Sequence, residues 1–138
     1  MDTITISTIV HAPRERAWKH FTSPESIKKW AYASPDWHAP FAENDVRIGG
    51  SFCTRMEAKD GSTGFDFTGT YTAVVENERI EYVMDDGRKV IVIFEDGDTG
   101  VVVTETFDPE SENPLDMQRA GWQAILNNFA LFTESVEA

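Results

Sequence analysis

The chain has 138 residues, of which 24 are acidic and 12 basic, so its formal net charge is −12, and 41% of its residues are hydrophobic. This length predicts one domain over residues 1–138, with enough apolar residues to form a core. An acidic surface without a basic cluster repels phosphate groups, so nucleic acid and anionic membrane surfaces are poor partners.

The cysteine content and the N-terminal sequence indicate which kinds of covalent link, metal site and cellular location to expect. Cys53 is the one cysteine, which excludes an internal disulfide and any multi-cysteine metal site. The sequence shows no signal peptide and no apolar run long enough to cross a membrane. We therefore expect a cytoplasmic protein without membrane insertion, as a monomer or a homodimer.

The first third of the chain predicts one strand, two short helices and a loop. Alternating β-prone residues over 4–9 favour a strand, and Pro13 is well placed to open a helix. A Ser-Pro-Glu sequence at 23–25 predicts a second helix, because it supplies a capping serine, a first-turn proline and an acid near the positive end of the dipole. Residues 33–45 hold two prolines and no clean period, so we expect a loop.

The middle of the chain predicts five strands in succession. Apolar residues recur at every second position, which is typical of strands with one buried face. Glycine-containing turns separate these strands, and a Gly-Gly pair at 49–50 predicts a bulge or bend within the first. Strands joined by such tight turns form an antiparallel meander. The expected strands cover residues 46–56, 65–73, 80–84, 89–94 and 101–107.

The C-terminal segment predicts a long helix over about residues 113–136. An Asn-Pro-Leu-Asp sequence at 113–116 is a strong helix start. At about 100° per residue, Trp122, Leu126 and Phe129 fall on one broad apolar face. The element order therefore predicts an α+β helix-grip fold. A curved antiparallel sheet of about six strands wraps around the long C-terminal helix, and two short helices follow the first strand.

Several sequence segments, taken together and in this order, are similar to a known family. They are Ala12–Trp18, Ser23–Glu25 with Trp30, Asp45–Phe52, Gly69–Tyr71, Arg79–Tyr82, Thr104–Phe107, and Gly121-Trp122 with Leu126. The chain resembles the START-like (SRPBCC) superfamily over nearly its whole length. Within that superfamily it resembles the branch named for the activator of the heat-shock-protein-90 ATPase, whose C-terminal domain is similar to this chain.

The resemblance implies a function located between the sheet and the long helix. The superfamily includes lipid and sterol carriers, plant hormone receptors and aromatase/cyclase-type proteins. We therefore expect a domain that binds or carries a small apolar or amphipathic molecule. The alternative is a protein-interaction domain of the chaperone ATPase-activator type, which would have a protein partner. A further alternative is a cyclase-like or isomerase-like enzyme that acts on an aromatic or polyketide substrate.

The candidate ligand-binding residues are mostly large apolar side chains expected on the inner faces of the sheet and the helix. Taken singly, each also fits ordinary core packing, but as a set they predict an apolar pocket with a few polar anchors. The candidates are Trp30, Trp37, His38, Phe52, Met56, Phe65, Phe67, Tyr71, Tyr82, Met84, Glu105, Trp122, Leu126 and Phe129.

Two of these predictions concern position as well as identity. Residues 31–45 are expected to form the mouth of the cavity, with Trp37 and His38 responding to the ligand; otherwise His38 is a solvated loop residue and Trp37 covers the core. Glu105 shares its strand parity with apolar residues, so it is the carboxylate most favoured to point inward. A buried carboxylate has a raised pKa and is a candidate acid or ligand anchor.

The sequence points to no catalytic residue, metal site or cofactor. The three histidines show no metal-ligand spacing with a second ligand residue. Cys53 has no evident basic partner that would activate its thiol, so we interpret it as structural. The glycines do not form a phosphate-binding loop. A binding protein is therefore favoured over an enzyme.

Overall fold

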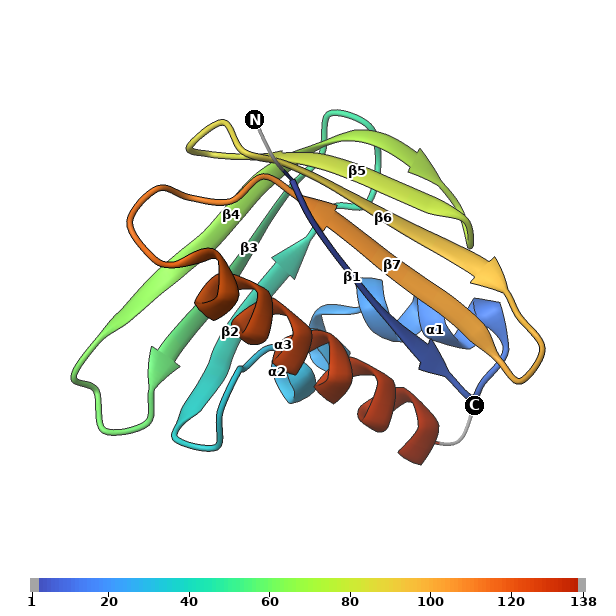
Figure 1. Cartoon of the computed structure of the whole chain (residues 1–138), viewed down its shortest axis with the longest axis horizontal. Coiled ribbons are helices and arrows are strands. Elements are labelled where there is room, and N and C mark those ends of the chain that lie inside the picture. The colour runs from blue at the N-terminus through green and yellow to red at the C-terminus, as the bar shows by residue number, and fades with distance from the viewer. Residues whose placement is uncertain (1–2, 137–138) are drawn as a thin grey trace.

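A computed structural model describes residues 3–136, which form one curled antiparallel sheet of seven strands and three helices (Figure 1). The sheet curves into a half-barrel around the C-terminal helix, and the predicted α+β class is confirmed. In chain order the elements are β1 (Ile4–Val10), α1 (Arg14–Thr22), α2 (Pro24–Trp30), β2 (Trp37–Asn44), β3 (Ser51–Ala58), β4 (Gly64–Val75), β5 (Arg79–Met84), β6 (Lys89–Asp96), β7 (Val101–Phe107) and α3 (Leu115–Ser135).

The strand order places the first and the last strand side by side at one edge of the sheet. The order is β1-β7-β6-β5-β4-β3-β2, so the strands from β2 to β7 form a meander and β1 is added beside β7. The register pairs Ile4 with Phe107 and Val10 with Val101. Because α3 follows β7, it lies next to β1 and crosses the concave side of the sheet (Figure 1).

Side chains of α3 cover the outer edge of β1. An edge strand presents unpaired backbone groups that other chains can pair with. Here the Arg119 Nη1 donates to the Thr5 carbonyl at 2.9 Å, and the Gln123 Nε2 donates to the Ser7 carbonyl at 3.0 Å. These bonds fix the helix along the strand and occupy two of its free carbonyls.

The expected loop over residues 33–45 is wrong for its second half, which forms the edge strand β2. The sequence hid this strand for two reasons. A bulge between His38 and Phe41 breaks the alternation of buried and exposed residues. Pro40 also lacks a backbone donor, which is tolerated at an edge where no further strand pairs. The sheet therefore has one strand more than the six expected from sequence.

The expected strand 46–56 begins later than predicted. Residues 45–50 form a tight turn, closed by bonds from the Gly50 N–H to the Arg47 carbonyl and from the Asp45 N–H to the Ser51 carbonyl. Gly49 has a φ of +85°, a conformation that side-chain-bearing residues rarely adopt. Ile48, expected to share the inward parity, lies on the outside of this turn and is exposed.

The long helix starts two residues after its expected capping asparagine. Pro114 occupies the cap position without a side-chain cap bond, and the helix begins at Leu115. Asn113 instead bonds through its backbone N–H and its side-chain amide to the Glu110 carboxylate. Within residues 3–136 no helix is long and apolar enough to cross a membrane.

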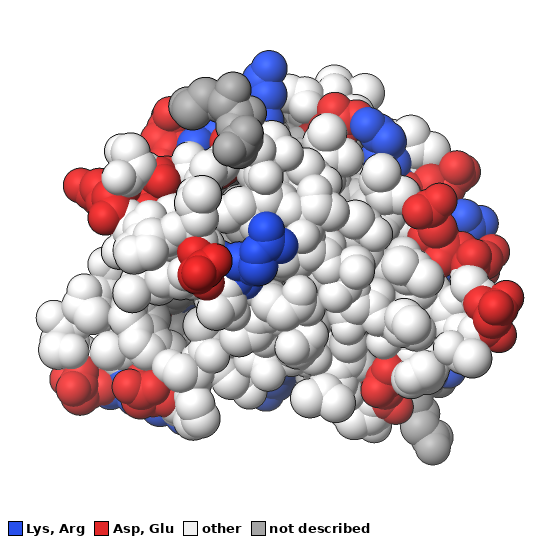
Figure 2. All heavy atoms as spheres, viewed as in Figure 1, with Lys and Arg blue, Asp and Glu red and all other residues white. Residues whose placement is uncertain are grey.

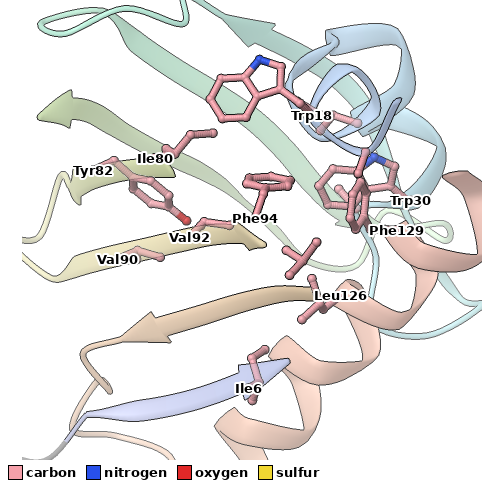
Figure 3. Packing of buried hydrophobic residues seen from close by; sticks show 14 of the residues in the cluster. Ile6, Trp18, Trp30, Ile80, Tyr82, Val90, Val92, Phe94, Leu126 and Phe129 are labelled. Atoms are coloured by element: carbon pink, nitrogen blue, oxygen red, sulfur yellow. The ribbon is translucent and has the colours of Figure 1, made fainter. Parts of the chain in front are cut away.

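The C-terminal half of α3 packs into an aromatic core (Figure 3). The Phe129 ring is fully buried and lies 5.2 Å from the Trp30 ring of α2 and 5.1 Å from the Phe21 ring of α1, measured between centroids. Phe94 of β6 contacts Phe21 at 5.5 Å and Trp18 at 5.4 Å. These edge-to-face contacts join both short helices, the sheet and α3.

Replacing Phe129 by Ala should lower the free energy of unfolding by about 3–5 kcal/mol, because it removes a fully buried ring from a filled core. Urea unfolding followed by circular dichroism measures this change. Leu131→Ala is the matched control on the exposed face of the same helix, and it should change stability by less than about 0.5 kcal/mol. A loss below about 1 kcal/mol for Phe129→Ala would contradict the packing of α3.

Candidate functional site

A cavity of about 480 Å³ lies between the N-terminal half of α3 and the concave face of the sheet. Ten of the predicted site residues line it, and they come from α2, α3 and strands β3, β4, β5 and β7. They are Trp30, Phe52, Met56, Phe65, Phe67, Tyr71, Tyr82, Met84, Glu105 and Trp122. The alternation of apolar residues in the sequence thus predicted much of the cavity wall, because every strand of a sheet that curls around a helix turns alternate side chains toward that helix.

Aromatic rings form one continuous wall of the cavity around Phe52. The centroid of the Phe52 ring lies 4.8 Å from that of Tyr82, 5.4 Å from Phe67 and 5.4 Å from Tyr71. Gly69 on the neighbouring strand makes room for the Phe52 ring. A Cβ atom at Gly69 would lie 2.7 Å from it, closer than van der Waals contact allows.

Trp122 lies flat against one wall and leaves the centre of the cavity open. Its ring stacks on Phe107 of β7, with centroids 3.9 Å apart and an interplanar angle of 10°. The Trp122 and Phe67 rings are edge-to-face, with centroids 6.1 Å apart. One turn earlier, Gln118 donates to the carbonyls of Glu110 and Asn113, which holds the β7–α3 loop at the end of the cavity.

Tyr71 anchors the wall to a residue that sequence reasoning missed. Its hydroxyl donates to the Asn44 Oδ1, and the Asn44 Nδ2 donates to the Thr22 carbonyl at 2.8 Å. Burial raises the pKa of Tyr71 to about 12, so the phenol stays neutral. Asn44 went unrecognised because it ends the unpredicted strand β2.

Glu105 is the one predicted charged residue that reaches the cavity. It lies in the middle of β7, paired with Ile6 of β1 and Val92 of β6, and is 8% exposed. Burial raises the pKa of its carboxyl from 4.5 to about 8. Burial, together with the charge of Glu105, also raises the pKa of Tyr82 well above its usual value. Among the hydrogen bonds within residues 3–136, none involves the Glu105 carboxyl.

Polar residues from three segments line the end of the cavity beside the β5–β6 hairpin and the β7–α3 loop. Arg88 Nε binds the Asp86 carboxylate at 2.8 Å, and the Thr68 hydroxyl donates to Asp85 at 2.5 Å. The remaining polar residues at this end are Asp66, Glu110 and Asn113. Figure 2 shows acidic side chains over the β7–α3 loop and, mixed with basic ones, over the β3–β4 hairpin. Sequence reasoning missed the residues of the hairpin and the loop because turn residues carry no parity signal, and it missed Asp66 and Thr68 because they alternate with the inward-facing residues of β4.

Four predicted site residues lie outside the cavity lining. Leu126 and Phe129 are fully buried and fill the core beyond its inner end. Trp37 and His38 lie on β2 and line a separate surface pocket, so residues 31–45 do not form the predicted mouth; Ala31 and Asn44 alone of that range line the cavity.

The contacts of β2 explain this displacement. His38 Nε2 lies 3.4 Å from the Glu57 carboxylate, and the Trp37 ring lies 6.1 Å from the Phe65 ring.

The remaining strand charges and the cysteine belong to the outer face of the sheet. Arg55 binds Glu57 at 3.1 Å, and Arg79 binds Glu81 at 2.6 Å, so these ion pairs lie side by side along their strands. Cys53 lies on the opposite face of β3 from Phe52, and burial raises the pKa of its thiol. This agrees with a structural role for Cys53, because a reactive thiol needs a lowered pKa.

The free energy of unfolding should depend on pH through Glu105. The folded protein holds this proton more tightly than the unfolded chain does. Its contribution to stability is therefore complete below about pH 4.5 and is lost as the pH rises through about 8. Glu105→Gln removes this loss, so the variant should be more stable than the wild type at pH 9, by a few kcal/mol, and nearly equal at pH 5.

Urea unfolding at pH 5, 7 and 9 measures the difference. Glu95→Gln, at an exposed position of β6, is the matched control for removing one negative charge from the protein. Parallel pH profiles for the wild type and Glu105→Gln would contradict the buried position of this carboxyl.

Comparison with known proteins places the chain in a family. A family model described as activator of Hsp90 ATPase homolog 1-like protein matches residues 11–134. The chain is similar to the solution structure of an AHSA1-like protein from Aeromonas hydrophila, with 44% identity, a TM-score of 0.91, and coverage of 97% of this chain and 93% of that one. It is also similar to Chr148 from Cytophaga hutchinsonii, with 48% identity, a TM-score of 0.83, and coverage of 96% and 92%.

More distant structures share the fold alone. CV1439 from Chromobacterium violaceum is 24% identical, with a TM-score of 0.85 and coverage of 96% of each chain. A search of curated proteins finds no match. Because the family model spans nearly the whole chain and the similar structure from Aeromonas hydrophila is that of an AHSA1-like protein, the protein belongs to the AHSA1-like family of the SRPBCC superfamily.

Proposed function

We propose that this protein binds a small apolar or amphipathic molecule in the cavity under α3. The observation that carries the proposal is the unfilled space of about 480 Å³ behind a wall of aromatic side chains. This volume lies within the range of about 300–1,000 Å³ that is typical of small-molecule sites. The SRPBCC fold commonly binds hydrophobic ligands, which agrees with this location.

The packing of the protein supports a ligand rather than an incidental void. Protein interiors are packed about as densely as organic crystals, and few voids exceed the size of a water molecule. This cavity is partly open to solvent, and without a ligand its apolar lining lacks the dispersion contacts that a packed interior would provide. Here Phe52 and Trp122 pack sideways against neighbouring rings instead of closing the space. A ligand with an apolar body would restore those contacts.

Polar groups at isolated points of the wall favour an amphipathic ligand. Thr54 is 5% exposed and lines the cavity together with Tyr82 and Glu105. Within residues 3–136, no hydrogen bond involves the Tyr82 hydroxyl. A few polar groups in an apolar pocket orient a ligand by its own polar group.

The neutral fluorescent probe N-phenyl-1-naphthylamine should bind saturably, with one molecule per chain, and its emission should shift to shorter wavelength as it enters the apolar cavity. Fluorescence titration measures the affinity. A thermal-shift screen over fatty acids, sterols, flavonoids and polyketide-like aromatics should show a raised melting temperature with at least one class, because a ligand of the folded state stabilises it. Absence of saturable probe binding, together with no shift across this panel, would contradict the proposal.

Filling the cavity should separate binding from stability. Ile125 lies on α3 and lines the space, so Ile125→Trp should weaken binding of the probe by about tenfold or more while the protein stays folded. Leu131→Trp introduces the same side chain on the exposed face of the same helix and should leave binding unchanged. Equal affinities of these two variants for the probe would show that it binds elsewhere.

A further inference from the structure

Resting on the cavity function proposed above, we infer that the preferred ligand carries a protonated amine on an apolar body, and that Glu105 and the aromatic wall hold this amine. The inference combines three observations, namely a buried carboxyl without a hydrogen-bond partner, aromatic faces around the same space, and an acidic rim.

Glu105 is arranged to accept a positively charged group from the cavity. It is more than nine-tenths buried and lines the open space. Its neighbours across the sheet, Ile6 and Val92, are apolar and offer it no donor. A buried carboxylate that lacks a partner is strongly disfavoured, and a charged donor relieves that cost through a charge-assisted hydrogen bond. An ammonium group supplies both the charge and the donor.

The groups that face Glu105 from the surrounding elements leave this role to a ligand. Tyr82 of β5 and, beyond it, Tyr71 of β4 are neutral phenols near neutral pH, because burial raises the pKa of both. Arg88, in the β5–β6 hairpin, is the basic residue of the cavity lining, and its guanidinium already binds Asp86. From α3 the lining residues are Gln118, Trp122 and Ile125, which do not titrate. The strands next to Glu105 contribute apolar side chains to this face.

The aromatic wall favours a cation over a neutral or anionic head group. Four aromatic rings surround the space, and the centroids of neighbouring rings lie 4.8–6.2 Å apart. They belong to Phe52, Phe67, Tyr71 and Tyr82. The face of an aromatic ring carries negative electrostatic potential, so it attracts an ammonium group, and the attraction grows when water is excluded. The same rings contact the apolar body of the ligand.

The charge at the entrance adds to this selectivity. Four carboxylates line this end of the cavity. Asp66 and Asp86 are paired with Arg55 and Arg88, whereas Asp85 and Glu110 form no ion pair among the described residues. The whole chain carries a formal net charge of −12. Such a field raises the local concentration of cations and repels carboxylates and phosphates. Figure 2 shows acidic side chains over the β7–α3 loop, which borders this end.

Three ligands with one tail and different head groups test the inference: decylamine, 1-decanol and decanoate, each titrated against bound N-phenyl-1-naphthylamine. At pH 8.5 decylamine should displace the probe at a concentration about tenfold lower than decanol needs, and decanoate should be weakest. Between pH 6 and pH 8.5 the affinity for decylamine should rise by about tenfold or more. Glu105 must lose its proton for the pair to form, whereas an alkylammonium resembles a lysine side chain and stays protonated. The affinity for decanol should stay constant.

Two variants assign the effect to Glu105. Glu105→Gln should remove the preference for the amine and its pH dependence while keeping decanol affinity within about threefold. Glu95→Gln, the matched loss of one carboxylate at an exposed position of β6 outside the cavity lining, should keep both. Calorimetry at pH 7 in two buffers of different ionisation enthalpy should show about one proton released per decylamine bound in the wild type and none in Glu105→Gln.

The possible failures are distinguishable. Displacement by decanol and decylamine with equal affinity and without pH dependence would overturn the cationic ligand and leave the cavity function standing. An equal loss of amine preference in Glu95→Gln and Glu105→Gln would assign selectivity to the net charge of the protein and overturn the role of Glu105. Failure of the probe and of all three ligands to bind would overturn the cavity function itself.

Discussion

The packing of α3 against the curled sheet is the interaction on which the rest of the structure depends. The C-terminal half of this helix is fixed by Phe129, which is buried among the rings of α1 and α2. Its outer side is fixed to β1 by Arg119 and Gln123, which bond to backbone carbonyls. Because α3 is held at its C-terminal half and along β1, its N-terminal half can stand away from the sheet while the helix keeps its position. The dense core and the cavity are thus two parts of one packing arrangement.

The cavity stays open because its large side chains find partners within the walls. Trp122 lies flat on Phe107, Phe52 fits the space left by Gly69, and the Tyr71 hydroxyl bonds to Asn44. Each of these side chains gains contacts from a neighbouring strand and therefore has less to gain by turning into the open space. Directed contacts of this kind let a short chain keep a cavity large enough for a ligand.

Glu105 is the clearest departure from what stability alone would select. An apolar residue in the middle of β7 would continue the pattern of Val103 and Phe107 and avoid the cost of burying a carboxyl. Groups that break the local pattern and have strongly shifted pKa values concentrate at functional sites. The position of Glu105 in the wall of the cavity connects this cost to the proposed function, because a cationic ligand would supply the missing partner.

The sequence alone determined the α+β class, the order of most elements and much of the cavity wall. The alternation of apolar residues along the strands and the apolar face of the last helix are both periodic patterns that can be read from neighbouring residues in the sequence. The inward placement of Glu105 followed from the same alternation. The edge strand Trp37–Asn44 escaped recognition, because a bulge and a proline interrupt its period and its formation depends on pairing with β3.

Tertiary structure decided which apolar residues fill the core and which line a space. Phe129 and Trp122 lie on the same face of α3, yet one is fully buried in the core and the other borders the cavity. Tertiary structure also brought together the acidic residues at the cavity entrance from segments far apart in the chain, and it placed Trp37 and His38 in another pocket. The physical reason is that periodicity sets the direction of a side chain, whereas the distance between facing elements depends on the curvature of the whole sheet.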